Sequence, residues 1–318
     1  MPNNMTSAPI LTPTAPASSL RFLSIGECMI EMAPGNVPGT FQMGFAGDTF
    51  NTAWYMRALR PDIATQYFTQ VGTDAVSDAM LDKMADAGID TAHVARSANS
   101  TVGLYMISLN NGERSFSYWR SQSAARQLAN DPQALAEAMA SADLIYLSGI
   151  TVAILNASGR DALLNAVQTA RRNGKTVAFD SNLRPRLWES AADMTATIMR
   201  FAGACDIVLP SFDDEAVHFG DATIEDTLAR YRNAGAATVV VKNGGGSVRY
   251  WHADVDGTVT PPPVIAIIDT TSAGDSFNAG FFAGLDKPLS MPERILAASR
   301  VAGQVIASKG ALVQLQHI

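Results

Sequence analysis

The sequence is poor in the residue types from which metal centres and disulfides are built. Its 318 residues include two cysteines, Cys28 and Cys205, whose separation matches no metal-ligand spacing, and four scattered histidines. Positive charge is also scarce, because the net charge is −7 and no run of Lys or Arg exceeds two residues. Proteins that bind nucleic acid usually carry a basic face, so nucleic acid is not an expected partner. We expect two buried thiols in a reducing cytoplasm.

Long apolar stretches are missing as well. Nowhere do ~18 consecutive apolar residues occur, so the sequence predicts no membrane-spanning helix and no membrane partner. Residues 1–20 hold four prolines and no charged side chain, whereas a signal peptide requires basic residues followed by an apolar run. We therefore predict a disordered tail over residues 1–20 and one folded domain over residues 21–318.

Short apolar strands alternate with amphipathic helices over the second half of the chain. This alternation predicts an α/β fold with a mostly parallel sheet flanked by helices. In such sheets, ligands bind beyond the carboxyl ends of the strands. The predicted strands cover residues 143–149, 176–180, 206–210 and 238–242, and the predicted helices residues 157–173, 223–234, 273–285 and 291–308.

The first half of the chain begins with a buried strand over residues 21–27. Residues 41–60 are predicted to start as a Gly-containing loop and to continue as a helix. Residues 102–120 form two apolar runs around the turn Asn110-Asn111-Gly112-Glu113, which predicts a β-hairpin. We expect segments near 28–46 and 97–121 to form a small β-sheet lid over a site.

The most specific motif is Asp269-Thr-Thr-Ser-Ala-Gly-Asp-Ser-Phe-Asn-Ala-Gly280, in which a polar loop opens an apolar helix. The amides of Ala273, Gly274 and Asp275 would then lie free at a helix N-terminus, a geometry that binds phosphates. Small residues allow a phosphate to approach the backbone closely. The alternative is that this segment is only a well-capped helix start.

This string resembles the carboxy-terminal signature of the ribokinase-like (PfkB-type) carbohydrate kinases, D-T-x-G-A-G-D-x-F-x-x-G. The resemblance implies that Asp275 is the catalytic base and that Ser272, Ala273 and Gly274 cradle a phosphate of ATP, with Mg²⁺ as the accompanying metal. Ser272 stands where the family usually has Gly. Because Ser is small and tolerates a helix start, we expect little effect.

A second motif lies near the amino terminus. Residues 46–53 resemble the G-G-x-x-x-N-x-A segment of the same family. The resemblance implies that Asp48 and Asn51 bind sugar hydroxyls and that Gly47 allows close backbone contact. The alternative is a capped helix start with Asp48 as the N-cap.

Two arginines among aromatic residues indicate the type of sugar. Tyr105 lies on the first hairpin strand, Tyr118 and Arg120 lie on the second, and Arg184 follows a predicted strand. Guanidinium groups bind carboxylates well, although either arginine could instead be a solvated surface charge. The strings GECMIE, GDTFNTA, GERSFSYWR, YLSGI, NLRPRLW and DTTSAGDSF, spread over residues 21–312, resemble the 2-keto-3-deoxygluconate kinases of the family. That resemblance implies that Arg120 and Arg184 hold the sugar carboxylate.

The nucleotide side is implied by the segment Val240-Val-Lys-Asn-Gly-Gly-Gly-Ser247, which resembles the family's ATP-side loop and is alternatively a plain β-turn. The metal ligands stay open, with Asp214 or Glu215 as candidates through water. The residues implied to bind ATP are Asn182, Arg184, Ser211, Lys242, Asn243, Gly244 and Gly246, with Ser299 near the adenine.

The resemblance implies a kinase that transfers the γ-phosphate of ATP to the C6 hydroxyl of 2-keto-3-deoxygluconate. Kinases of the same family for fructose, ribose or another keto sugar acid remain alternatives, as does a non-catalytic sugar-binding sensor. The sequence has neither a P-loop string nor a G-x-G-x-x-G fingerprint, so a nicotinamide oxidoreductase is not indicated. By resemblance, we also expect a homo-oligomer.

Overall fold

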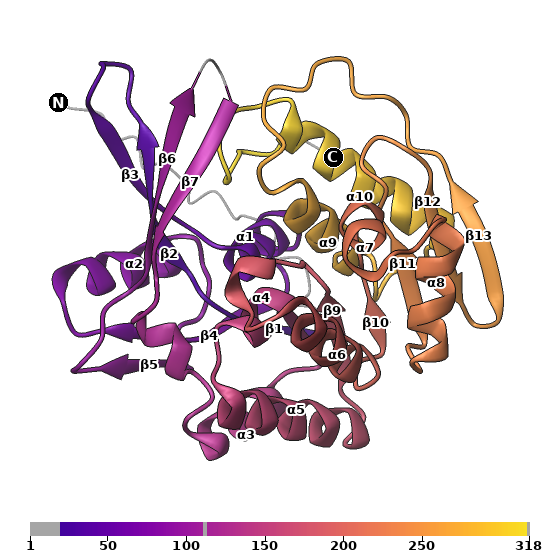
Figure 1. Cartoon of the computed structure of the whole chain (residues 1–318), viewed down its shortest axis with the longest axis horizontal. Helices are drawn as coiled ribbons and strands as arrows, with labels where there is room; N and C mark the ends of the chain where they lie inside the picture. The colour runs from indigo at the N-terminus through magenta and orange to yellow at the C-terminus, as the bar shows by residue number, and fades with distance from the viewer. Residues whose placement is uncertain (1–19, 111–112, 317–318) are drawn as a thin grey trace, which may run out of the picture.

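The computed structural model describes residues 20–110 and 113–316, which form two β-sheets with helices around the larger one (Figure 1). The tail predicted for residues 1–20 lies outside the described residues, apart from Leu20. No helix within these described ranges is both long and apolar enough to cross a membrane.

A nine-stranded sheet forms the centre of the molecule, in the order β13-β12-β11-β10-β9-β8-β1-β4-β5. Neighbouring strands from β11 to β5 pair parallel, whereas β11, β12 and β13 pair antiparallel at one edge. The predicted fold, α/β with a mostly parallel sheet, is therefore confirmed. The strands are β1 (Arg21–Ile25), β4 (Ala64–Gly72), β5 (Val94–Ser97), β8 (Leu144–Ser148), β9 (Thr176–Asp180), β10 (Ile207–Val208), β11 (Thr238–Val241), β12 (Val248–His252) and β13 (Val255–Val259).

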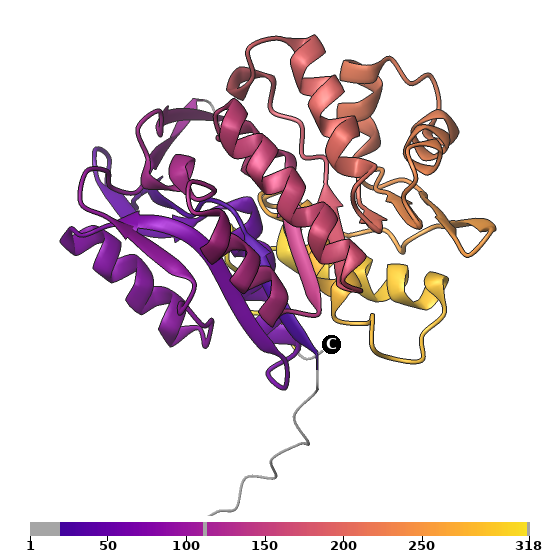
Figure 2. The same ribbon diagram turned by 90° about the horizontal axis from the view of Figure 1, so that it is seen from below.

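Helices cover both faces of this sheet. Successive side chains of a strand point to opposite sides, and here the side chains on both sides are apolar and need a cover. In β8, Ile145 and Leu147 belong to one core cluster, and Leu144 and Tyr146 belong to the other. Helices α3, α5, α6 and α8 pack in the first cluster, and α1, α2, α9 and α10 pack in the second (Figure 2). The helices are α1 (Asp48–Leu59), α2 (Ala75–Asp86), α3 (Pro132–Ser141), α4 (Gly149–Ala153), α5 (Ala157–Arg172), α6 (Ala191–Ala202), α7 (Phe212–Phe219), α8 (Ile224–Asn233), α9 (Ala273–Phe282) and α10 (Met291–Ile306).

Helix boundaries follow local capping chemistry. The Asp74 side chain accepts a hydrogen bond from the Ser77 amide and begins α2, and Gly88 follows that helix with a φ of 74°. Ser290 and Glu293 form a reciprocal capping box at the start of α10. Such caps satisfy backbone groups that a helix end leaves without partners.

The second sheet has the order β3-β2-β6-β7 and lies at the upper left of Figure 1, above α2. Its strands are β2 (Met29–Pro34), β3 (Phe41–Ala46), β6 (Leu104–Asn110) and β7 (Glu113–Trp119), and β6 and β7 form the predicted hairpin. The prediction of a loop at the start of residues 41–60 is wrong, because all of β3 pairs antiparallel with β2, from Met29–Ala46 to Pro34–Phe41. The hydrogen bonds between two strands depend on which segment pairs with which, and the local sequence does not show the partner.

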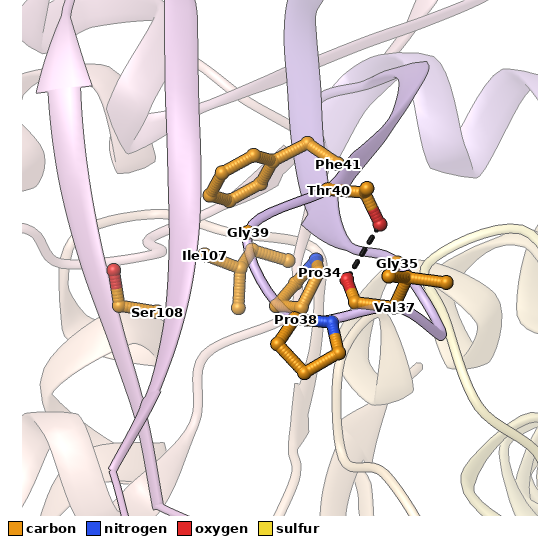
Figure 3. Close-up of a pocket in the computed structure, with 9 residues that line it drawn as sticks. All are labelled: Pro34, Gly35, Val37, Pro38, Gly39, Thr40, Phe41, Ile107 and Ser108. Atoms are coloured by element: carbon orange, nitrogen blue, oxygen red, sulfur yellow. Dashed lines mark hydrogen bonds between the residues drawn. The ribbon is translucent and has the colours of Figure 1, made fainter.

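A small pocket lies at the far tip of the second sheet (Figure 3). The turn that joins β2 to β3 forms one wall, where the Thr40 hydroxyl donates to the Val37 carbonyl at 2.6 Å, and Ile107 and Ser108 of β6 complete the lining. None of the described residues that line this pocket is ionisable. The predicted chemistry lies elsewhere.

Candidate active site

The predicted catalytic and phosphate-binding residues come together at the carboxyl ends of the parallel strands. Asp180 is the last residue of β9, Ser211 follows β10 and Lys242 follows β11. The N-termini of α1 and α9 reach the same place, because Asn51 of α1 bonds to Asp275 of α9. This is the edge at which open parallel sheets bind their ligands.

Two residues of α1 hold Asp275 in place. The Asn51 side-chain amide donates to the Asp275 carboxylate and to the Ser272 hydroxyl, at 2.8 Å in each case. The Thr52 hydroxyl donates to the Asp275 backbone carbonyl at 3.2 Å, and the Gly47 amide donates to the Asn51 side-chain oxygen at 3.3 Å. Two predicted motifs more than 200 residues apart therefore form one hydrogen-bonded unit.

Two further carboxylates belong to the same cluster. Asn182 donates from its side chain to Asp48 at 2.7 Å and from its backbone to Asp180 at 3.1 Å. Asn182 has a φ of 30°, outside the usual region for a residue with a side chain. Asp48 does not cap α1, because the N-cap residue is Gly47 and makes no side-chain cap bond, so the capping alternative is not supported.

Burial and like charge set the pKa of this cluster. Burial is the largest influence on Asp275 and raises its pKa to about 7, and the Asp48 and Asp180 carboxylates add to the rise. The hydrogen bond from Asn51 and the positive charge of Lys242 act in the opposite direction. Burial also raises the pKa of Asp48. A carboxylate with a pKa near neutrality is suited to accept a proton in catalysis.

The N-terminus of α9 offers two backbone amides to a ligand. Within the described ranges, the amides of Gly274 and Asp275 have no protein acceptor. The Ala273 amide is not free as we expected, because it donates to the Thr270 carbonyl at 3.2 Å. Ser272 has φ 61° and ψ 15°, in the left-handed region, and this conformation folds residues 270–273 into a turn.

The predicted nucleotide segment is a turn between β11 and β12. The Gly246 amide donates to the Asn243 carbonyl at 2.7 Å, and Gly244 has a φ of 49°. The side chain of Lys242 leaves this turn and bonds to Asp180 at 2.7 Å. The segment thus contains a β-turn over residues 243–246, and the residue that precedes the turn, Lys242, reaches the carboxylate cluster.

Of the other residues predicted on the nucleotide side, one lies beside Lys242 and two contact groups outside the carboxylate cluster. Ser211 bridges to Lys242 in the backbone, and Arg184 lies 3.6 Å from the Asp214 carboxylate with a half-exposed side chain. The hydroxyl of Ser299 donates to the Ile295 carbonyl of its own helix, α10.

The residues predicted on the second sheet form their own pairs. Arg120 is buried and pairs with the buried Glu27 carboxylate, and Tyr105 donates to Glu31. Burial and the Glu31 charge raise the pKa of Tyr105. The Tyr118 ring centre lies 6.0 Å from the Arg120 guanidinium carbon. Arg120 is one of the two arginines expected to clamp a carboxylate, and in this structure Glu27 is the partner that its buried charge requires.

Glu27 is a residue that sequence reasoning missed. A Cβ atom at Gly47 would lie 2.2 Å from the Glu27 carbonyl, so Glu27 passes directly beside the start of α1. It thereby links the second sheet to the carboxylate cluster. The only signal in the sequence is a pair of acidic residues four positions apart, Glu27 just before β2 and Glu31 within it.

The candidates for a metal ligand separate into two kinds. Glu215 is fully buried and accepts hydrogen bonds from Ser181 at 2.6 Å and Arg230 at 2.8 Å, so it is not available to a metal ion. Asp214 is partly exposed, and burial raises its pKa. Among the described residues, no group of three His, Cys, Asp or Glu side chains could hold a metal. A magnesium ion that takes most of its ligands from water and substrate phosphates is compatible with this arrangement.

Comparison with known proteins identifies the family of this chain. The sequence model of the pfkB family carbohydrate kinases matches residues 20–317. The 2-dehydro-3-deoxygluconokinase of Haemophilus influenzae is 38% identical over 297 residues, which cover 91% of this chain and 94% of that protein. The 2-dehydro-3-deoxygluconokinase of Thermotoga maritima has a similar structure, with a TM-score of 0.81, 19% identity and coverage of 93% and 95%. The fructokinase of Xylella fastidiosa with bound ATP has a TM-score of 0.78, 22% identity and coverage of 92% and 93%. The chain therefore belongs to the pfkB family of carbohydrate kinases.

Proposed function

We propose that this protein phosphorylates 2-dehydro-3-deoxygluconate, the compound also called 2-keto-3-deoxygluconate, at its C6 hydroxyl with ATP as the phosphate donor. The observation that carries the proposal is the pairing of Asp275 with Asn51 beside free amides of α9. The 38% identity to a 2-dehydro-3-deoxygluconokinase over nearly the whole chain supports the choice of sugar.

Asp275 acts as the general base in this proposal. Its carboxylate takes the proton of the C6 hydroxyl as that oxygen attacks the γ-phosphorus of ATP, and ADP leaves. The hydrogen bond from Asn51 orients the carboxylate, and Asp48 and Asn51 bind sugar hydroxyls. Positioning and electrostatic stabilisation account for most of the catalysis in phosphoryl transfer.

Negative charge on the transferred group meets donors at the N-terminus of α9. The amides of Gly274 and Asp275 lack protein acceptors among the described residues, and a helix N-terminus favours anions. A bound Mg²⁺ ion would supply further positive charge at the phosphates, and Asp214 would contact it through water. Asn182, Arg184, Ser211 and the turn at Asn243, Gly244 and Gly246 would bind the remaining phosphates and the nucleoside.

The acidic sugar requires positive charge of its own. Arg184, whose side chain is 50% exposed and lies 3.6 Å from the Asp214 carboxylate, would bind the carboxylate of the sugar. Arg120 can contribute only while it shares its guanidinium with Glu27. Tyr105 and Tyr118 lie beside Arg120 on the second sheet, which would close over the sugar as a lid and exclude water.

The direct test is ADP release from Mg-ATP with a panel of 2-dehydro-3-deoxygluconate, 2-ketogluconate, fructose, ribose and no sugar. We expect the highest kcat/KM with 2-dehydro-3-deoxygluconate. A preference for fructose or ribose would retain Asp275 as the base and reject the carboxylate clamp. No sugar-dependent ADP release, together with measurable sugar binding, would favour a non-catalytic sensor.

A further inference from the structure

Lys242 makes a set of contacts that goes beyond binding a nucleotide. Its ammonium donates to the Asp180 carboxylate at 2.7 Å and to the Asn278 side-chain oxygen at 3.2 Å. The Asn278 side-chain nitrogen in turn donates to the same Asp180 oxygen at 2.7 Å and to the Tyr146 hydroxyl at 3.2 Å. The three side chains close a ring that joins β9, β11 and α9.

These contacts are buried, so only side chains with matching hydrogen-bonding groups can occupy these positions. The side chains of Lys242 and Asp180 are 12% and 6% exposed, and Asn278 is fully buried. Two charges in such a place need close geometry and further hydrogen bonds to offset their desolvation. Asn278 meets this need because an amide both accepts from an ammonium and donates to a carboxylate, which neither Asp nor Leu can do.

The ring leaves one ammonium N–H for a ligand. Among the residues that the structure describes, Lys242 donates only to Asp180 and Asn278, although an ammonium carries three protons. A Cβ atom at Gly274 would lie 3.5 Å from the Lys242 nitrogen, so the ammonium faces the N-terminal turn of α9. The Gly274 amide there has no protein acceptor within the described ranges. A positive charge and a free amide then point to the same place, as in sites that hold phosphate.

We propose that Asp180 and Asn278 are positioning residues that hold the Lys242 ammonium against the phosphoryl group in transfer. This inference rests on the proposed kinase function. A lysine side chain is flexible, and without the ring it would lose much of its orientation before the reaction begins. Asn278 lies one helical turn after Asp275, so α9 carries both the base and the residue that orients the cation.

A double-mutant cycle between Asn278→Ala and Lys242→Ala tests this role. We expect Asn278→Ala to lower kcat by about 10- to 100-fold, because a misplaced catalytic group loses that order of rate, while KM for the sugar changes little. We expect the double variant to be no slower than Lys242→Ala alone, because Asn278 acts through that lysine. Losses that multiply, or an unchanged kcat in Asn278→Ala, would overturn the proposal.

Binding provides a second measurement that does not depend on the sugar. Calorimetric titration with Mg-ATP and Mg-ADP should show weaker ATP binding by Asn278→Ala and unchanged ADP binding, because ADP lacks the group that Lys242 faces. Equal losses for both nucleotides would indicate a general disturbance and reject the role. If the sugar panel fails and the ATP–ADP difference persists, the substrate assignment is wrong and the positioning role stands.

A matched control separates positioning from stability. Thr227 of α8 is also fully buried, and its hydroxyl donates to Asp221 at 2.6 Å, so Thr227→Val removes a buried hydrogen bond on another element. We expect it to lower the melting temperature and leave kcat unchanged. Should Asn278→Ala fail to fold, Asn278→Ser keeps a small polar side chain and takes its place in the cycle and in the titrations, with the same outcomes deciding.

Discussion

A carboxylate that accepts a proton near neutral pH needs a pKa above its ordinary value of 3.8, and the surroundings of Asp275 provide this. Burial disfavours the ionised form, and Asp48 and Asp180 repel it. Lys242 and Asn51 oppose both influences and keep the ionised form accessible. The pKa of about 7 is therefore a property of the cluster.

At this scale, the pH dependence of catalysis follows from the sign of the shift. A base must be ionised, so kcat/KM should fall about tenfold per pH unit as pH decreases below about 7. Replacing Asp48 by Asn removes a repelling charge, lowers the pKa of Asp275 and should move this limb to lower pH. Initial-rate profiles from pH 5 to 9 measure the limb. A limb that stays in place in Asp48→Asn would mean that another group titrates.

Removal of the Asp275 charge should separate catalysis from stability. Asp275→Asn should reduce kcat by several orders of magnitude and leave ATP binding nearly intact. The folded state binds the Asp275 proton more tightly than the unfolded chain, so this carboxyl group lowers the stability of the fold progressively as pH rises from about 4 to about 7, and the loss is complete above that. We therefore expect the variant to melt higher than the wild type at pH 8, with a gain that shrinks as pH falls toward 4. Near wild-type kcat would refute the base.

At the scale of elements, the residue before α9 is constrained by its backbone conformation. We expected little effect from Ser272 because its side chain is small, whereas its backbone dihedral angles matter more. The backbone there is left-handed, which suits Gly because a Cβ atom crowds the neighbouring carbonyl in that region. Ser272 retains the conformation and its hydroxyl accepts a hydrogen bond from Asn51 at 2.8 Å. The residue thus offsets backbone strain with a contact to α1.

Two substitutions at Ser272 isolate the backbone cost. Both Ser272→Gly and Ser272→Ala lose the bond from Asn51, but only Ala retains the Cβ atom in the left-handed region. We expect Ser272→Ala to be less stable than Ser272→Gly by about 1 kcal/mol. Urea denaturation of the two variants measures the difference. Equal stabilities would show that the loop relaxes to another backbone conformation.

The pair between Arg120 and Glu27 ties the end of β7 to the loop after β1. Replacing Arg120 by Ala leaves a buried carboxylate without its partner, so we expect a loss of about 3–5 kcal/mol in the free energy of unfolding. The double variant with Glu27→Gln should recover part of that loss, as judged by chemical denaturation. No recovery would mean that packing, not charge, explains the cost. Arg184→Ala leaves no buried carboxylate without a partner, so it tests the carboxylate clamp with a smaller effect on stability.

At the scale of the whole molecule, the second sheet has an apolar face on which several of the described side chains are exposed to solvent. Phe41, Met43 and Trp119 share this face, and they are 42%, 55% and 58% exposed, respectively. Met32 pairs with Met43 on one side and with Met106 on the other, which extends the face across three strands. Exposed apolar areas of this kind often mark interfaces, so the homo-oligomer expected from the family resemblance is predicted to pair through this face.

A charge on this face should weaken the pairing. Met43→Glu would place a carboxylate in an apolar contact, so we expect a shift toward monomer in sedimentation velocity at micromolar concentration. Val217→Glu is the matched control, because Val217 is also an exposed apolar residue, at 74%, on α7. A wild-type protein that sediments as a monomer, or a Met43→Glu dimer as stable as the wild type, would reject the interface.

Sequence patterns within a short segment predicted the strands whose apolar residues are contiguous, but not a strand that depends on its pairing partner. Strand β9 covers residues 176–180 as predicted, because a short buried apolar run carries its own signal. The start of residues 41–60 was misjudged, since β3 exists only through its pairing with β2. Asp275 and Asn51 were identified through motifs, whereas Asn278 was not, because one amide in an apolar helix gives no sign of its partners.

The sequence by itself determined the family, the parallel α/β architecture and the candidate base, because these depend on contiguous motifs and on the periodicity of apolar residues. Only the tertiary structure decided that Arg120 is paired with Glu27, that Ser272 is left-handed and that Asp180 and Asn278 hold Lys242. Two of these features are contacts between side chains on different elements, and Ser272 is contacted by Asn51 of another helix, α1. Their charges and hydrogen bonds are set by burial and distance, which exist only once the chain has folded.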